Sequence, residues 1–211
     1  DEKILLLIHA SNLMLTLPEK VQVHLIDQKR GVELAIFRKC RNVVSFSKTL
    51  EEAEVNLQAI FKTIQDRYDL FEKEDVVDIA EYNGAFPDNP LPLLIVVIDE
   101  FSMLRSSKRA THIIEDIAAI GRAAGCHLLL STQRPDSDVL NGKIKANVPI
   151  VLGLKTRNEL NSRIILDEPG LEKLRGMGHG VLRYCGEFTE LQTMRLEPEK
   201  ARQYLAPTRK P

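Results

Sequence analysis

The sequence predicts an α/β fold: a mostly parallel sheet flanked by helices, with a C-terminal β-hairpin. Short apolar segments alternate along the chain with longer segments of helical periodicity, which is typical of strand–helix–strand units in a parallel sheet. The segment Leu93–Ile98 is apolar at every position, as expected of a central strand covered on both faces. Toward the C-terminus, two strand-like segments flank Cys185-Gly186, which favours a hairpin.

In the first part of the chain, an amphipathic helix is expected after Thr49. Thr49 and Glu52 have the spacing of a capping box, and apolar residues then recur at helical intervals to about Glu72. The apolar segment Ile4–Leu17 is expected to form a helix that lies on the sheet. The other elements expected here are two strands and a short helix: Val21–Ile26, Val43–Phe46 and Asp75–Asn83.

A second large helix is expected at Thr111–Ala124, where isoleucines recur at helical spacing and Gly125 provides an end. The segment Glu197–Pro211 is polar with three prolines and is expected to fray. We therefore predict one domain at 1–196 and a polar tail at 197–211. The remaining expected elements are four strands and one helix: His127–Ser131, Ile150–Leu154, Val181–Tyr184, Glu190–Leu196 and Leu160–Leu166.

Composition and charge limit the classes of function. The 211 residues suit one large domain with a substantial core, and a hydrophobic fraction of 44% excludes wholesale disorder. No apolar run approaches the length of a membrane span. Lys and Arg number 29 against 30 Asp and Glu, so the net charge is −1. A domain that coats nucleic acid by bulk charge would be strongly basic, so DNA binding here would need a local patch or an assembly.

Cysteine, histidine and the chain start add three expectations. Cys40, Cys126 and Cys185 lie far apart and form no CxxC pair, so we expect reduced, buried thiols in a cytosolic compartment. The five histidines have no metal-ligand spacing. The start at Asp1 has no initiator Met and no signal-peptide pattern, so we expect the chain to be part of a longer protein.

Polar residues follow three of the expected strands. Asp99 and Glu100 end the central strand, Gln133 follows the next strand, and Asp27 ends the first. Parallel strands bring their carboxyl ends to one edge of a sheet. In nucleotide hydrolysis, the first acid holds Mg²⁺ through water and the second polarises the attacking water, while the amide of Gln133 would sense the γ-phosphate. The alternative is that these strands simply meet solvent at polar residues.

Several blocks in one order resemble the FtsK/SpoIIIE family of DNA-pumping ATPases, over roughly residues 9 to 196. The resemblance implies a RecA-like P-loop NTPase core, hydrolysis of ATP with Mg²⁺, a homo-hexameric ring around the substrate, and cofactor-binding roles for Asp27 and Lys29. The matching blocks are Asp27-x-Lys29 with Val32-Glu33-Leu34, Asp99-Glu100, Arg122–Leu128, Ser131–Pro135, Ile144–Pro149, Ser162–Asp167 and Leu174–Gly180.

One family motif is not present in the sequence. The family has a glycine-rich P-loop before its first helix, whose amides and Lys hold the phosphates. The family's spacing puts Asp1 and Glu2 about where the Lys-Ser/Thr of this loop would stand, and no glycine precedes Gly31. Either the P-loop lies outside these residues or the domain is a degenerate ATPase; the retained Asp99, Glu100 and Gln133 favour the first. In both cases we expect these residues alone to bind nucleotide poorly.

Arg163 and two lysines are candidates for contacts outside the acidic edge. Arg163 lies in the family's Ser-Arg-x-Ile-Leu-Asp block and could reach a neighbouring subunit's phosphoryl group, a role for which Arg134 and Arg157 are the competitors. The alternative for Arg163 is an ion pair with Asp167. Lys143 and Lys145 lie in an expected Gly/Asn loop and could touch backbone phosphates of a substrate. The alternative for them is a solvated loop.

The leading hypothesis is therefore the ATP-hydrolysing motor domain of a DNA translocase, in conjugative transfer or in chromosome or plasmid segregation. Overall likeness favours conjugative transfer. Such a protein would work in the cytoplasm at the inner face of the membrane, through an anchor outside these residues. The alternative is a silent module that binds substrate or regulates a neighbouring motor, as in type VII protein secretion. A Rossmann enzyme is disfavoured, because the sequence has no GxGxxG.

Overall fold

The structure is a computed structural model that describes residues 14, 16–133, 140–194 and 196–210. Its main sheet has four parallel strands in the order β2-β1-β3-β4. The predicted α/β class with a mostly parallel sheet is confirmed. The strands are β1 (Val21–Asp27), β2 (Val43–Ser47), β3 (Leu93–Asp99) and β4 (Cys126–Leu130).

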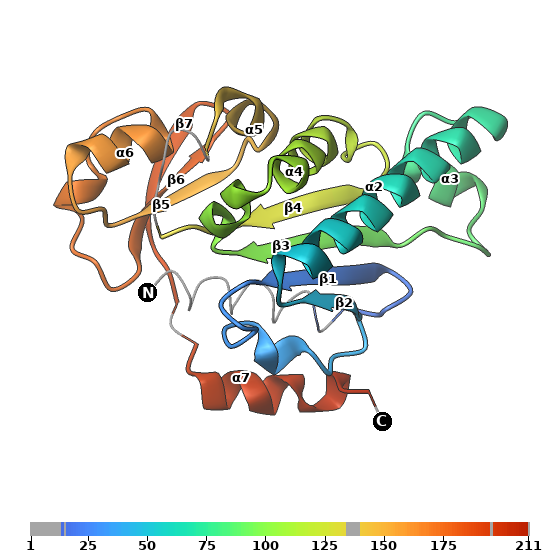
Figure 1. Ribbon diagram of the computed structural model, residues 1–211, viewed down its shortest axis with the longest axis horizontal. Helices are drawn as coiled ribbons and strands as arrows, with labels where there is room; N and C mark the ends of the chain where they lie inside the picture. Colours follow the sequence, from blue (N-terminus) through green and yellow to red (C-terminus); the bar gives the residue numbers. More distant parts are fainter. Residues whose placement is uncertain (1–13, 15, 134–139, 195, 211) are drawn as a thin grey trace.

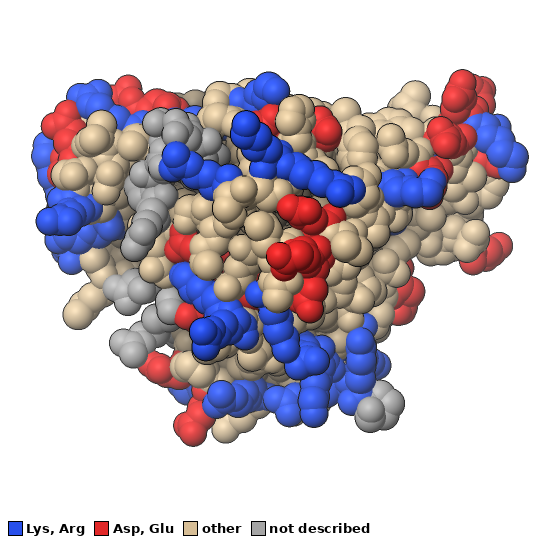
Figure 2. Space-filling view, viewed as in Figure 1, with Lys and Arg blue, Asp and Glu red and all other residues tan. Residues whose placement is uncertain are grey.

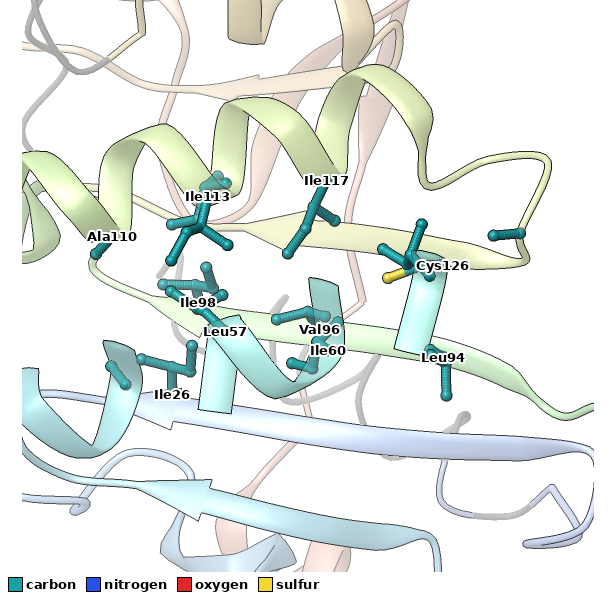
Figure 3. Packing of buried hydrophobic residues seen from close by; sticks show 14 of the residues in the cluster. Ile26, Leu57, Ile60, Leu94, Val96, Ile98, Ala110, Ile113, Ile117 and Cys126 are labelled. Carbon is teal, nitrogen blue, oxygen red and sulfur yellow. The ribbon is translucent and has the colours of Figure 1, made fainter. Parts of the chain in front are cut away.

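Helices cover one face of this sheet and give the molecule its larger core. Figure 1 shows α2 and α4 side by side on that face. In Figure 3, Ile113 and Ile117 of α4 and Leu57 of α2 lie over the inner strands. Because successive strand residues point to opposite faces, the alternate residues of β3 pack there. The helices on this side are α2 (Leu50–Lys73), α3 (Ile79–Ala85) and α4 (Lys108–Ile120), with a 3₁₀ segment η2 (Phe101–Ser106) before α4.

Local signals in the sequence account for the helix starts. The predicted capping box is present: Thr49 Oγ1 accepts from the Glu52 N–H, and the Glu52 carboxylate accepts from the Thr49 N–H. The predicted helix at Asp75–Asn83 begins later, because the Asp78 side chain caps it by accepting from the next N–H groups. The helix predicted to end at Gly125 is α4, and it ends earlier, at Ile120. That predicted end is therefore wrong.

The opposite face of the sheet carries a smaller core, and here the predicted fraying of the tail is wrong. The segment forms α7 (Pro198–Leu205) and η4 (Ala206–Thr208), with Leu205 fully buried against β1 and η1 (Ala35–Phe37). Apolar residues at helical spacing in a mostly polar segment are enough to dock it. The predicted helix at Ile4–Leu17 falls largely outside the described residues. The domain boundary at residue 196 stays a prediction.

A second, antiparallel sheet of three strands follows the main one along the chain. The strand predicted at Ile150–Leu154 pairs with the hairpin, and not with the parallel strands. The hairpin is confirmed, but its second strand begins directly after the two-residue turn, because Cys185 and Gly186 both have positive φ. Its members are β5 (Val151–Leu154), β6 (His179–Tyr184) and β7 (Glu187–Gln192), with α5 (Gly142–Asn147), α6 (Glu159–Leu166) and η3 (Leu171–Lys173) nearby.

All three cysteines are free thiols. Cys40 and Cys126 are buried, as predicted, and burial raises the pKa of Cys126 to about 12. Cys185 is exposed, contrary to the prediction, because it lies in the tight turn of the hairpin where the side chain points away from any core.

Candidate functional site

Polar side chains gather where the parallel strands end. Asp27 and Asp99 are register partners at the ends of β1 and β3, and β4 lies beside β3 as predicted. The segment after β4 therefore emerges next to Glu100, whose carboxylate accepts from the Gln133 N–H at 3.3 Å. The sheet thus brings together four of the predicted site residues, and Lys29 joins them from the loop after β1.

Asp27 organises the loop that carries Lys29. Its side chain is fully buried, with Oδ1 accepting from the Lys29 N–H at 3.1 Å and Oδ2 from the Leu34 N–H at 2.8 Å. Both carboxylate oxygens are thus engaged by backbone groups, which the loop would otherwise leave without partners. The predicted part of Asp27 in cofactor binding stays a prediction; its visible role is to fix the loop.

Lys29 faces the acid pair. Its Nζ lies 3.2 Å from Glu100 Oε2 and 3.9 Å from Asp99 Oδ2. Both carboxyl groups are almost completely buried, so among the described residues this ammonium offsets their charge. Sequence reasoning assigned Lys29 to cofactor binding and missed this ion pair, because contact between residues 29 and 100 depends on the pairing of β1 with β3.

Among the described residues, four donate hydrogen bonds to the Glu100 carboxylate. Ser102 Oγ and Thr132 Oγ1 donate to Oε1 at 2.5 and 2.9 Å, and the Gln133 N–H and Lys29 Nζ donate as well. Burial raises the pKa of this carboxyl, but these donors outweigh it, so the pKa lies below its ordinary range. Glu100 also has a left-handed backbone with φ 53°, a conformation that costs about 1–3 kcal/mol and is held by surrounding contacts.

Asp99 has a different environment from its neighbour. Ser131 Oγ donates to Oδ1 at 3.1 Å, whereas Oδ2 is buried and has no hydrogen-bond partner among the described residues. Burial raises the pKa of Asp99, and the Lys29 ammonium and the Ser131 hydroxyl only partly oppose this. A buried carboxylate oxygen without a donor suits a hydrated cation.

The described residues contain no cluster of three or more acids, histidines or cysteines that could hold a metal by itself. Mg²⁺ in phosphate-transfer sites is bound by one or two carboxylates together with phosphate oxygens and water. Asp99, with one oxygen free of donors, fits that arrangement. Sequence reasoning did not find Ser102 and Thr132; hydroxyl residues next to the acid and next to the glutamine were the available signal.

Arg163 lies apart from this edge, on α6 beside the second sheet. Its Nη2 pairs with Glu159 Oε1 at 2.8 Å, so the predicted alternative of a pair with Asp167 is wrong. Asp167 ends α6 in a left-handed conformation, and its carboxylate faces Lys145 at 2.6 Å and Arg183 at 2.5 Å. The Arg163 side chain is half-exposed, and its contact with a neighbouring subunit stays a prediction.

Lys143 and Lys145 lie in the short helix α5, and not in the loop expected from the sequence. The Asn141 side chain caps the helix by accepting from the N–H groups of Lys143 and Ile144, which explains the difference. Lys143 pairs with Glu115 of α4 at 3.1 Å and Lys145 with Asp167. Substrate contact by either lysine stays a prediction; Lys143 is the more exposed of the two.

The sequence profile of the FtsK/SpoIIIE family matches residues 6–137, which is more than half of the chain and includes the whole acid edge. The chain belongs to the FtsK/SpoIIIE family. The protein named DNA translocase FtsK from Streptococcus pyogenes serotype M3 (strain SSI-1) is 37% identical over 181 residues, covering 80% of this chain and 22% of that protein. The protein of the same name from Treponema pallidum (strain Nichols) is 37% identical over 169 residues, 76% of this chain and 21% of that one.

Solved structures share the fold of this FtsK/SpoIIIE domain at low sequence identity. The pCW3 conjugation coupling protein TcpA, in its monomer form with ATPgS, superposes with a TM-score of 0.86 at 22% identity, over 98% of this chain and 61% of that one. The cytoplasmic domain of the type VII secretion ATPase EccC from Thermomonospora curvata gives 0.84 at 23% identity, over 98% and 26%. The predicted RecA-like core is confirmed.

This FtsK/SpoIIIE chain spans about a fifth of the length of the curated relatives it matches. Within the part of the chain that the structure describes, no helix is both long and apolar enough to cross a bilayer.

Proposed function

We propose that this chain is the ATP-hydrolysing motor segment of a DNA translocase. The observation that carries the proposal is the contrast between the adjacent acids at the end of β3. Glu100 is surrounded by donors that favour its charged form, whereas one oxygen of Asp99 has no hydrogen-bond partner among the described residues. Family membership and the names of the relatives support DNA translocation, and ATP is the nucleotide that the family implies.

In this proposal the two acids have different roles. Asp99 would hold Mg²⁺ through water, with its carboxylate positioned by the hydroxyl of Ser131. Bound Mg²⁺ would supply charge neutralisation at the phosphates. Glu100 accepts a hydrogen bond from the attacking water and polarises it. Both carboxylate oxygens of Glu100 already accept hydrogen bonds from described residues, so in this proposal the water takes the place of one of these donors.

Gln133 and Lys29 complete the proposed site. The Gln133 side chain is exposed beside Glu100, where its amide can bond both the γ-phosphate and the water. Lys29 and Asp27 are proposed to bind the nucleotide from the loop after β1, which Asp27 holds in place through the Lys29 N–H. Arg163 is proposed to act on the nucleotide of a neighbouring subunit, since its half-exposed side chain pairs, among the described residues, with a glutamate on the surface of the same helix.

The partners in the proposal follow the same line. DNA is favoured over secreted protein, because relatives at 37% identity are named DNA translocases. We propose conjugative transfer or chromosome or plasmid segregation as the process, a homo-hexameric ring as the assembly, and Lys143 and Lys145 as substrate contacts. The protein would act in the cytoplasm, at the inner face of the membrane through an anchor beyond these residues.

The test is Glu100→Gln in the full-length protein. The amide keeps the shape of the side chain but cannot act as a base, so DNA-stimulated ATP hydrolysis should fall by about 10²–10⁴-fold while ATP binding persists. The matched control is Asp116→Asn, which neutralises an exposed acid on α4 and should leave hydrolysis unchanged. Hydrolysis is followed by phosphate release and binding by a fluorescent ATP analogue.

A different outcome would support the silent module. If the wild-type protein binds neither ATP nor its analogue, or binds without hydrolysing and Glu100→Gln changes nothing, the motor function is excluded for this domain. A role in binding substrate or regulating a neighbouring motor would then replace it.

A further inference from the structure

A cluster of basic residues lies on the opposite end of the main sheet from the acid edge. We name this cluster the basic patch; it consists of Arg38, Lys39, Arg41, Arg209 and Lys210. Figure 2 shows blue side chains gathered in the lower part of the molecule, over α7, the C-terminal residues and the segment between β1 and β2. The two parts of the patch are far apart in the sequence, and tertiary contact brings them together.

Backbone pairing holds the two segments in place. Cys40 and Arg209 form an antiparallel bridge. The Lys210 N–H donates to the Lys39 carbonyl at 2.7 Å, and the Arg41 N–H donates to the Thr208 carbonyl at 2.8 Å. The backbone that carries the charges of the patch is thus held in one arrangement.

The position of the patch follows from its neighbours. Asn42 is buried and donates to the carbonyl of Val21, the first residue of β1. Lys210 Nζ donates to the carbonyl of Val43, the first residue of β2. The patch therefore lies at the amino end of these strands, whereas Asp27, Asp99 and Glu100 lie at the carboxyl end. It is separate from the proposed hydrolysis site.

The cations of the patch have no acidic partners within the described parts of the chain. All five residues are exposed, and none takes part in an ion pair with another described residue. In contrast, Lys29, Lys62, Lys143 and Lys145 are each paired with a carboxylate. Like charges held together repel one another, so an anionic partner would relieve a standing repulsion.

We propose that the basic patch binds the phosphate backbone of duplex DNA. Three of its members are arginines, whose guanidinium groups contact phosphate oxygens in pairs. Within residues 38–43, the non-basic residues Cys40, Asn42 and Val43 are buried, so this segment offers charge without exposed bulky apolar groups. A membrane-binding surface adds such apolar groups. The choice of DNA as partner rests on the proposed function, whereas the anionic character of the partner rests on the patch itself.

The proposed basic patch explains how a chain of net charge −1 could hold DNA. Bulk charge does not favour binding, but a local group of unpaired cations releases counterions from the phosphates it contacts. Such contacts position the duplex without selecting its sequence, as a translocase that moves along any DNA requires.

The test compares two triple variants by fluorescence anisotropy with a labelled duplex at several salt concentrations. The patch variant is Lys39→Gln/Arg41→Gln/Arg209→Gln. Arg38 and Lys210 are left in place, because Arg38 lies over the Phe46 ring and Lys210 bonds a backbone carbonyl. The control variant, Lys62→Gln/Lys73→Gln/Lys173→Gln, removes the same charge from exposed lysines on α2 and η3. Circular dichroism checks that both variants are folded.

The proposal predicts that the DNA affinity of the patch variant, and not that of the control variant, depends less steeply on salt concentration than the wild-type affinity does. Each lost phosphate contact reduces the slope of log K against log salt by about 0.9. Three contacts correspond to about 2.7, so between about 50 and 200 mM salt the wild-type affinity should fall about 40-fold more than that of the patch variant. Equal slopes for the patch and control variants overturn the proposal. So does patch-dependent binding to phosphatidylserine vesicles by a protein that ignores duplex DNA.

The result is independent of the hydrolysis test. If Glu100→Gln abolishes hydrolysis and the patch variant binds DNA like the wild type, the patch proposal alone fails. If the patch variant loses DNA affinity but the protein hydrolyses no ATP, the proposed motor function fails and the patch remains a DNA-binding surface.

Discussion

At the scale of single residues, Asp99 and Glu100 show how adjacent acids acquire different properties. Both are buried, and burial alone would raise both pKa values. The backbone turns into the left-handed region at Glu100, which directs its side chain toward Ser102, Thr132 and Lys29. Asp99, still within β3, receives one hydroxyl. A single change in φ therefore separates the two roles that the proposed chemistry requires.

Lys29 is the residue whose substitution separates two interpretations. Lys29→Met removes a cation that pairs with Glu100 and should lower kcat for ATP hydrolysis about 10- to 100-fold, as for other residues that orient a site. If Lys29 acts through its contact with the acids, KM for ATP should change little, whereas the proposed part in nucleotide binding would raise KM. Lys29→Arg, which keeps the charge, should recover part of the rate. Steady-state kinetics on the full-length protein measures both; a rise in KM alone would instead assign Lys29 to nucleotide binding.

His24 predicts a dependence of stability on pH. It lies in β1, with Nδ1 2.9 Å from Ser45 Oγ, and burial lowers its pKa from 6.5 to about 4. The unfolded chain therefore binds a proton at a pH where the folded chain does not. The stability that the neutral, buried His24 ring contributes is complete above pH 6.5 and is lost as the pH falls toward 4. The loss in the free energy of unfolding is up to about 3 kcal/mol.

The measurement is the free energy of unfolding in urea at several pH values. His24→Leu should flatten the decline of stability between pH 6.5 and 4 relative to the wild type. Ser45→Ala serves as the control, because it removes the hydrogen-bond partner but keeps the buried ring. Parallel pH curves for the wild type and His24→Leu would show that other groups cause the acid sensitivity.

At the scale of elements, α2 illustrates a helix that local sequence determines. Its start is fixed by the reciprocal bonds of Thr49 and Glu52, and its buried apolar residues face the larger core. Both signals lie within a few residues of one another, so the prediction from sequence was correct. The two-residue turn of the hairpin was equally local, but β7 was misplaced, because an exposed edge strand has little apolar pattern.

The cap of α2 gives a stability prediction. Thr49→Ala removes the oxygen that accepts from the Glu52 N–H and should lower the free energy of unfolding by about 1 kcal/mol. The control is Thr63→Ala in the exposed middle of the same helix, where alanine is the better helix former and stability should hold or rise slightly. Urea titration of the three proteins gives the comparison. An equal loss in both variants would mean that the capping box contributes nothing.

At the scale of the whole molecule, the sheet divides two cores, and the C-terminal helix closes the smaller one. Leu205 and Ala201 are fully buried, and the segment after α7 pairs with the residues before β2. The chain end therefore both stabilises the fold and supplies two members of the basic patch. Stability and the proposed DNA contact depend on the same docking.

This docking is tested by Leu205→Ala. Removal of a fully buried leucine side chain should cost about 2–5 kcal/mol in the free energy of unfolding. Gln203→Ala, at an exposed position of the same helix, should change it by less than about 0.5 kcal/mol. If both variants match the wild type, the helix is not packed on the sheet and the patch would lose its support.

The sequence by itself determined what depends on neighbours along the chain. The helical repeat of α2, the apolar run of β3, the acids at its end and the turn at Cys185-Gly186 are local patterns, and local geometry decides them. Family blocks added the RecA-like core. These signals predicted the position of the acid edge, because parallel strands necessarily end on one side of a sheet.

Only the tertiary structure decided which distant residues meet. The pairing of Lys29 with Glu100, the partners of Asp167, the sheet that β5 joins and the contact between Cys40 and Arg209 all join segments far apart in sequence. No periodicity specifies such contacts. They depend on how the faces of helices and sheets pack and on how strands align. A buried side chain such as that of Leu205 contributes to stability only when the apolar surface that covers it has formed.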